Sequence, residues 1–343
     1  MRTGIVKDGR FAGHSPGPGH VESPERVLAL NRMVEESGLP LVLIEPRPAS
    51  EKELGFIHDP DYIRLVRSTA GRELTALDAD TAASSLSWET ARLAAGGAVE
   101  AAAAIMEGRV TNALALVRPP GHHAEAGAAR GFCLFNNIAI AAQSLVQDGG
   151  LERVLIADWD LHHGNGTQHS FYSRSDVLFF STHQYPFYPG TGHWSETGEG
   201  RGRGYTLNVP LAPGKTDSDY LYIYRTLLGA AARRFKPQFI LVSAGFDIYG
   251  GDPLGGMDLS AAGFGALAAE LKSLAEELCQ GRLLLVLEGG YSLPGLRDGA
   301  KEVLLQLTGT GRPSAVRAQA SAKTLRELQP VFQVFRQYWD LGI

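Results

Sequence analysis

The chain has 343 residues, of which 44% are hydrophobic and 20% charged, and a formal net charge of −5. These values are typical of a globular protein with a large core and argue against a disordered chain. The acidic balance lacks the positive charge with which proteins bind nucleic acids or anionic membranes, and no stretch approaches the roughly 20 apolar residues of a membrane span. We therefore expect a cytoplasmic protein with a single domain over residues 1–343 and no nucleic-acid or membrane partner. A homo-oligomer is compatible with the sequence.

Short apolar segments without period-two alternation predict strands that are buried on both faces, and helical patterns lie between them. Because strands alternate with helices, the sequence predicts an α/β fold with a mostly parallel central sheet of about eight strands and helices on both faces. The expected strands are residues 4–6, 41–44, 113–117, 154–157, 177–181, 206–209, 239–243 and 283–287. The expected helices are residues 88–106, 137–146, 219–235, 261–278 and 296–307.

The cysteine and histidine counts restrict the kind of metal site that the chain can form. Two cysteines, Cys133 and Cys279, are too few for a disulfide framework or an all-thiolate zinc site. Seven of the ten histidines lie between His122 and His193. Long Gly- and Pro-rich loops follow three expected strands, at the sheet edge where open α/β sheets bind ligands. Any metal is therefore expected there, on His, Asp or Glu.

The strongest signal is DWDLHHGNGTQ at residues 158–168, directly after an expected strand. Asp158, Asp160 and His162 occupy alternating positions, which share one face of an extended strand end. Carboxylate and imidazole ligands suit zinc, and also iron, cobalt or manganese. The alternative interpretation is an aspartate that caps a helix, with buried histidines that are satisfied by hydrogen bonds.

A second motif, RPPGHH, places tandem histidines His122 and His123 on a loop that proline and glycine restrict. Held close together, and partnered by carboxylate or amide groups, two imidazoles can serve as a general base and an electrostatic stabiliser. The alternative for this segment is a solvent-exposed pair.

Two further strand ends supply polar groups. Asp247 in SAGFD is a candidate third metal ligand in a site that keeps a position open for water and substrate, and the alternative is a turn aspartate. Asp252, before a proline, is expected to be a turn residue. Tyr291 in LEGGY is a candidate hydrogen-bond donor to a developing oxyanion, or an ordinary core tyrosine.

Aromatic residues on two Gly- and Pro-containing loops, residues 131–137 and 185–192, are candidates for the walls of a slot for an aliphatic chain. The alternative is simple core packing. Cys133 is expected to be a small buried apolar residue and not a nucleophile, since nothing in its surroundings is expected to lower its pKa.

Taken together, the motifs resemble the zinc-dependent histone deacetylase family, which has the arginase/deacetylase fold. The segments RPPGHHA, GFCLFNN, DWDLHHGNGTQ, YPGTG, SAGFD and LEGGY occur in that order, and the matching region begins at His20-x-Glu22-x-Pro24-x-Arg26. Asn165 and the LEGGY form resemble the class II branch and its bacterial amidohydrolase relatives.

The resemblance implies a role for each matching position. Asp160, His162 and Asp247 would bind one catalytic Zn²⁺, although the ligand set also accepts Fe²⁺ or Co²⁺. His123 would be the general base and then the general acid, and His122 its electrostatic partner. The remaining catalytic roles fall to Asp158 and Asn165, as hydrogen-bond partners of the first and second tandem histidine, and to Tyr291, which would polarise the amide carbonyl. The other clustered histidines, His163, His169, His183 and His193, are expected to be structural.

The resemblance also implies substrate and potassium sites. Phe132 and Tyr188 would flank an acyl-lysine tunnel, with Gly131 beside that wall and Asp80 at the rim, where it would hold the substrate backbone. Relatives also hold structural K⁺. One such site matches Asp158, Asp160, His162, Ser181 and Thr182, and a second matches Phe171, Arg174, Val177 and Tyr205.

Substrate choice is expected to depend on the tunnel mouth. Polyamine-deacetylating relatives often carry an acid there, and the matching position here is Leu254. A neutral residue offers no Coulombic partner to a polyamine cation, so we expect acyl-lysine peptides or small N-acyl amines to be hydrolysed better than N-acetylpolyamines. Glu22 and Asp80 remain acids that can supply the missing contact.

Three different functions stay compatible with the sequence. The first is an acetylpolyamine amidohydrolase. The second is an arginase-like binuclear manganese ureohydrolase, which shares the fold but needs more bridging carboxylates and has no use for the Gly-Gly-Tyr element. The third is a non-catalytic acyl-lysine binder, which is disfavoured because the ligands, the base and the tyrosine are all present.

Overall fold

The computed structural model describes residues 2–339. Its central sheet is formed by β1 (Thr3–Val6), β2 (Leu41–Leu43), β5 (Asn112–Ala115), β6 (Val154–Asp158), β7 (Val177–Gln184), β8 (Thr206–Leu211), β9 (Phe239–Ala244) and β10 (Leu283–Leu287). The strand order is β2-β1-β5-β10-β9-β6-β7-β8, and every neighbouring pair is parallel. The eight expected strands and the α/β class are therefore confirmed, with boundaries that differ by a few residues.

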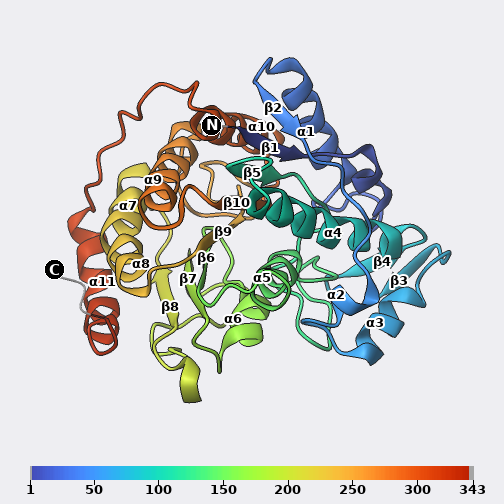
Figure 1. Cartoon of the computed structure of the whole chain (residues 1–343), viewed down its shortest axis with the longest axis horizontal. Coiled ribbons are helices and arrows are strands. Elements are labelled where there is room, and N and C mark those ends of the chain that lie inside the picture. Colours follow the sequence, from blue (N-terminus) through green and yellow to red (C-terminus); the bar gives the residue numbers. More distant parts are fainter. Residues whose placement is uncertain (1, 340–343) are drawn as a thin grey trace.

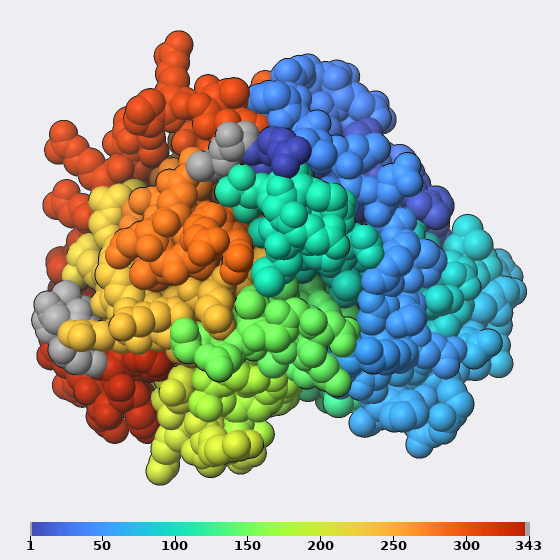
Figure 2. All heavy atoms as spheres, viewed as in Figure 1, coloured from blue at the N-terminus to red at the C-terminus, as the bar shows by residue number. Residues whose placement is uncertain are grey.

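Helices cover both faces of this sheet (Figure 1). They are α1 (Pro24–Glu36), α2 (Glu51–Leu54), α3 (Pro60–Arg67), α4 (Ser87–Met106), α5 (Asn137–Gln147), α6 (Asn165–Phe171), α7 (Asp217–Ile223), α8 (Gly229–Phe235), α9 (Ala261–Cys279), α10 (Leu293–Thr308) and α11 (Ala322–Phe335). A short hairpin of β3 (Leu74–Ala76) and β4 (Ala82–Ser84) lies apart from the sheet. Figure 2 shows segments from all parts of the sequence packed against one another on this side of the molecule.

Successive strand residues point to opposite faces and so build two separate cores. Leu155 and Leu285 belong to the core shared with α9 and α10, whereas Ile156 and Val286 belong to the core shared with α4 and α5. This division explains why the strands read as continuous apolar runs, because both of their faces are buried.

Two expectations about these elements are wrong in detail. The apolar pattern predicts that segment 41–44 is covered on both faces, but β2 pairs only with β1 and leaves the Leu43 side chain 54% exposed at the sheet edge. The expected helix 219–235 is divided into α7 and α8 by a π-helical turn at Tyr224–Leu228. Within that turn the Tyr224 hydroxyl donates to the Asp158 carbonyl at 3.2 Å, a long-range contact that periodicity alone does not reveal.

The topology brings the polar motifs to one edge of the sheet. The register pairs Asp158 at the end of β6 with Ser243 of β9, and Ser243 with Val286 of β10. The loops that follow β5, β6, β9 and β10 therefore begin side by side, in the middle of the sheet. These loops carry RPPGHH, DWDLHHGN, SAGFD and LEGGY, and their meeting point is the carboxyl-end edge at which α/β sheets bind ligands.

Among residues 2–339, no helix combines the length and apolar character that a bilayer crossing needs.

Two neighbouring glycines of α4 give a test of how tightly this helix packs on the chain before α2. An added Cβ on Gly96 would lie 1.8 Å from the carbonyl oxygen of Arg47, whereas one on Gly97 would lie 3.2 Å from a Val6 methyl group. We expect Gly96→Ala to lower the free energy of unfolding by roughly 1–3 kcal/mol or more, because the added methyl group would force the backbone at Arg47 to move. Gly97→Ala is the matched control, since its crowding is offset by a helix-propensity gain of about 1 kcal/mol. Chemical denaturation of both variants measures the difference, and equal stabilities would contradict this packing.

Candidate metal and catalytic site

The three residues predicted to bind a metal lie together at the carboxyl-end edge. Asp160 and His162 follow β6 and Asp247 follows β9; all three are buried, and their potential ligand atoms lie within 4.8 Å of one another. The Nδ1 atom of His162 is 3.2 Å from Oδ1 of Asp160 and 3.2 Å from Oδ2 of Asp247. Sequence reasoning therefore found the residues that form this cluster.

The surroundings of the two carboxylates fit a cation between them. Oδ2 of Asp160 accepts from the Gly289 backbone N–H at 2.9 Å, and Oδ1 of Asp247 accepts from the Leu161 N–H at 2.9 Å. The remaining Asp247 oxygen, Oδ2, is buried and makes no hydrogen bond within the described structure. Burial and the nearby Asp160 charge raise the pKa of Asp247 to about 7. Two carboxylates and an imidazole match the donor set of a zinc site with an open position.

The tandem histidines have different partners. His122 Nδ1 is 3.0 Å from Oδ2 of the buried Asp158, whereas His123 Nδ1 is 2.7 Å from Oδ1 of Asn165. Burial opposes a charge on His122, but Asp160 and Asp158 raise its pKa to about 10. Burial and the neighbouring His122 lower the pKa of His123 well below its ordinary value. The carboxylate partner thus favours a proton on His122, whereas the surroundings of His123 favour a neutral imidazole.

Sequence reasoning missed Glu288, a buried carboxylate that holds the histidine loop. Its Oε2 accepts from the backbone N–H groups of Gly121 at 2.6 Å and His122 at 3.1 Å, and its Oε1 accepts from the Ser243 hydroxyl at 3.1 Å. The signal was present in LEGGY, where an acid directly follows an apolar strand.

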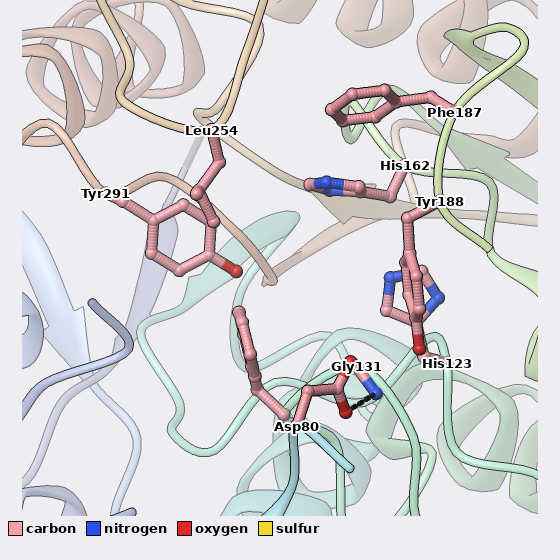
Figure 3. A pocket seen from close by; sticks show the side chains of 9 residues that line it. Asp80, His123, Gly131, His162, Phe187, Tyr188, Leu254 and Tyr291 are labelled. Atoms are coloured by element: carbon pink, nitrogen blue, oxygen red, sulfur yellow. Dashed lines mark hydrogen bonds between the residues drawn. The ribbon is translucent and has the colours of Figure 1, made fainter. Parts of the chain in front are cut away.

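A pocket of about 230 Å³ leads to the cluster (Figure 3). It contains His123 and His162 and every residue that was predicted to bind substrate. The lining residues are Asp80, His123, Gly131, Phe132, His162, Phe187, Tyr188, Leu254 and Tyr291. The hydroxyl of Tyr291 points into this pocket. His122 is absent from the lining, so only the second tandem histidine faces the pocket.

The wall at residues 131 and 132 requires a particular backbone. Gly131 has φ +52°, and a Cβ there would lie 2.3 Å from the His123 ring. Phe132 has φ +69°, a left-handed conformation that is uncommon for a residue other than glycine. Asp80 stabilises this turn by accepting from the Gly131 N–H at 3.1 Å, as Figure 3 shows. Asp80 therefore holds the backbone of this pocket wall, and its contact with a substrate backbone stays a prediction.

The second aromatic wall includes Phe187, which belongs to the expected aromatic loop 185–192 but was not among the individually predicted substrate-binding residues. Phe187 stacks on the His162 ring, with centroids 5.6 Å apart and an interplanar angle of 25°. Tyr188 meets the His123 ring edge to face at 5.2 Å. The two adjacent aromatics thus cover a metal-ligand candidate and the proposed base, respectively.

Asp252 does close a turn, as expected, because its Oδ1 accepts from the Leu254 N–H at 3.0 Å. Its Oδ2 also accepts from the Tyr291 N–H at 2.7 Å, a contact that the sequence did not suggest. Tyr291 is additionally covered by Arg26, whose guanidinium carbon lies 5.0 Å from the ring centroid. The turn aspartate therefore fixes the backbone of the tyrosine.

The predicted potassium residues occupy neighbouring strands and turns. Asp158 pairs in register with Ser181 across β6 and β7, and Thr182 follows Ser181 in β7. The Tyr205 carbonyl accepts from the Phe179 N–H beside the start of β8. The other members of the second set, Phe171, Arg174 and Val177, lie between the end of α6 and the start of β7. Potassium at either place stays a prediction.

Comparisons with known proteins identify the family. Residues 20–307 match the histone deacetylase domain. The chain is 42% identical over 299 residues to the "Probable deacetylase" of Archaeoglobus fulgidus, covering 86% of this chain and 83% of that protein. It is 38% identical over 331 residues to the "Histone deacetylase-like amidohydrolase" of Pseudomonas aeruginosa, covering 92% and 87%.

A solved structure and a human relative agree with that match. The crystal structure of the HDA15 HD domain superposes with a TM-score of 0.93 at 36% identity, covering 99% of this chain and 98% of that one. The human "Polyamine deacetylase HDAC10" is 41% identical over 307 residues, which cover 85% of this chain and 45% of that protein. The chain spans about half the length of several eukaryotic relatives, from 44% to 59%. It therefore belongs to the histone deacetylase family of hydrolytic deacetylases, a zinc-dependent family, and has the arginase/deacetylase fold.

Proposed function

We propose that this protein is a zinc-dependent amidohydrolase that removes acetyl or other acyl groups from lysine side chains or related N-acyl amines. The observation that carries the proposal is one apolar pocket in which His162 of the ligand cluster, His123 and Tyr291 all face the same space. Bound Zn²⁺ would supply Lewis acidity that polarises the amide carbonyl and lowers the pKa of a water molecule.

His123 is the group that handles protons. Asn165 occupies its Nδ1, so Nε2 is the nitrogen available to a reacting water. In the proposed sequence, His123 takes the proton of the attacking water and then delivers it to the leaving amine. His122, which contacts Asp158 and lies outside the pocket, stays charged and contributes electrostatically.

Tyr291 is the hydrogen-bond donor to the carbonyl oxygen. Burial raises the pKa of its hydroxyl well above the ordinary value, so the group keeps its proton. The backbone bond to Asp252 and the Arg26 guanidinium hold the ring in place, and a donor held in advance stabilises the negative charge that develops on the oxygen.

The pocket walls favour an extended aliphatic chain. Phe132, Phe187, Tyr188 and Leu254 present apolar surface along its length, which suits the methylenes of a lysine side chain. Because one human relative is named a polyamine deacetylase, an acetylpolyamine is the alternative substrate. Glu22 cannot contact such a cation, because its side chain is fully buried and paired with Arg118 and Arg26. Asp80 remains the acid at the rim.

A binuclear ureohydrolase and a non-catalytic acyl-lysine binder have less support. Asp160, His162 and Asp247 are the one cluster of potential metal ligands among residues 2–339, whereas a binuclear ureohydrolase requires ligands for two ions. A non-catalytic binder has no need for a base and an oxyanion donor that face the same pocket as the ligand cluster.

We expect Tyr291→Phe to lower kcat on an acetyl-lysine peptide by roughly 10²-fold, because one oxyanion donor is lost while the ring is kept. Steady-state kinetics measures the effect, with zinc content and thermal melting as controls for the fold. Turnover close to that of the unmodified protein would contradict the role of the hydroxyl.

Metal removal should abolish hydrolysis. We expect one zinc ion per chain by elemental analysis, loss of activity on chelation and recovery when Zn²⁺ is returned, because Asp160 and Asp247 are buried carboxylates that need a cation between them. Restoration to a higher rate by Fe²⁺ or Co²⁺ would change the metal assignment, and two manganese ions with guanidine hydrolysis would favour the ureohydrolase.

A melting temperature that rises with K⁺ but not with Na⁺ would support the predicted potassium sites.

The residue at position 254 should control the preference for a cationic substrate. The unmodified chain should prefer acetyl-lysine peptides to N-acetylspermidine. Leu254→Glu should raise kcat/KM for N-acetylspermidine by roughly tenfold, because the new carboxylate attracts the distal ammonium group. Leu254→Gln, which is similar in size and uncharged, is the matched control. A preference of the unmodified chain for the polyamine would overturn this substrate assignment.

A further inference from the structure

The amide of Asn165 is an ambiguous partner for His123. Its oxygen lies 2.7 Å from His123 Nδ1 and accepts a hydrogen bond from that nitrogen only if His123 carries hydrogen on Nδ1. If the amide turned over, its NH₂ group would face Nδ1 and would favour the tautomer with hydrogen on Nε2. That second tautomer cannot accept a proton from the pocket side. The orientation of one amide therefore decides whether His123 can act as a base.

Glu125 removes this ambiguity. The Asn165 Nδ2 group donates to Oε1 of Glu125 and to the His123 carbonyl, the latter at 3.3 Å. An ionised carboxylate accepts hydrogen bonds and cannot donate them, so it tolerates only the NH₂ side of the amide. A carbonyl oxygen turned toward Glu125 would meet another acceptor.

His169 keeps the Glu125 carboxyl group ionised and holds it in position beside Asn165. Its Nδ1 lies 2.9 Å from both carboxylate oxygens of Glu125. Burial would raise the pKa of Glu125, but the hydrogen bonds from His169 and Asn165 bring it below its ordinary value, so the carboxyl is ionised. Arg130 and Glu196 are the other charged groups that act on His169.

This pair lies outside the substrate pocket. Glu125, Asn165 and His169 line a different cavity, of about 430 Å³, which contains none of the residues around the substrate pocket. The His169 side chain is 51% exposed there and that of Glu125 20% exposed. Asn165 therefore connects the proposed base with an ion pair that does not touch the substrate.

We propose that Glu125 is a positioning residue that fixes the orientation of the Asn165 amide and, through it, the tautomer of His123 whose Nε2 accepts a proton. The inference rests on the proposed function, in which His123 is the general base. His122 needs no such device, because Asp158 is a carboxylate and presents an acceptor oxygen in either orientation.

Three variants of the zinc-loaded protein test the proposal. Glu125→Ala removes the acceptor, and we expect kcat to fall roughly tenfold while KM changes little. Glu125→Gln can still accept from Asn165 with its amide oxygen and donate to a neutral His169, so it should recover most of the lost kcat. Glu270→Ala is the matched control, because the Glu270 side chain is also 20% exposed and pairs with Arg225 away from the site. It should leave kcat unchanged.

Nitrogen-15 NMR of labelled histidine gives a readout that does not depend on activity. The signal of His123, assigned by its absence from His123→Gln, should show hydrogen on Nδ1 in the unmodified protein and in Glu125→Gln. It should show a mixture of tautomers in Glu125→Ala. An unchanged tautomer or unchanged kcat in Glu125→Ala would overturn the proposal, as would equal losses in the alanine and glutamine variants. If the unmodified protein hydrolyses no acyl amide, the proposed function fails, while the tautomer measurement still decides the role of Glu125.

Discussion

The two buried carboxylates of Asp160 and Asp247 are the constraint on which the rest of this site depends. Neither can be ionised in a dry interior without compensation, because the charge has lost its hydration. Backbone N–H groups of Gly289 and Leu161 satisfy one oxygen of each, and the other oxygens flank His162. A Cβ on Gly289 would lie 2.2 Å from an Asp247 oxygen, so glycine is needed for the backbone to come this close. The loops therefore hold two carboxylates in positions where a cation can bind between them.

A second buried charge group ties the loops to the N-terminal segment. The Glu22 carboxylate receives hydrogen bonds from Arg118 at 2.6 Å and from Arg26 at 3.1 Å. Arg118 begins the histidine loop, and Arg26 donates to the backbone carbonyls of Glu288 and Gly290 in the tyrosine loop. One acid just before α1 thus holds two loops that start from different strands. Its ion pairs explain why Glu22 cannot serve a substrate, although its place in the sequence made it a candidate.

Much of the fold and site could be predicted, for a physical reason. Strands buried on both faces need continuous apolar runs, and groups that follow parallel strands must meet at one edge, so Asp160, His162 and Asp247 were identifiable together. Residues whose role depends on a partner remote in sequence were not. Glu288 reaches a loop 167 positions away. The loop of Phe187 was expected to supply an aromatic wall, but the stacking of Phe187 on His162 depends on how that loop folds. Strand order was equally hidden, since apolar runs do not specify their neighbours.

The tandem histidines differ in their hydrogen-bond partners, which are a carboxylate for His122 and an amide for His123. Their ring centroids are 4.1 Å apart and both are buried, so two imidazolium charges would repel each other strongly. The carboxylate of Asp158 stabilises a proton on His122, whereas the uncharged amide of Asn165 gives His123 a hydrogen-bond acceptor without an attracting charge. An aspartate at position 165 would add that charge and raise the proton affinity of His123. With asparagine, the proposed base stays neutral until the reaction supplies a proton. An amide, unlike a carboxylate, must then be oriented by a third residue, and Glu125 is in contact with the Asn165 amide.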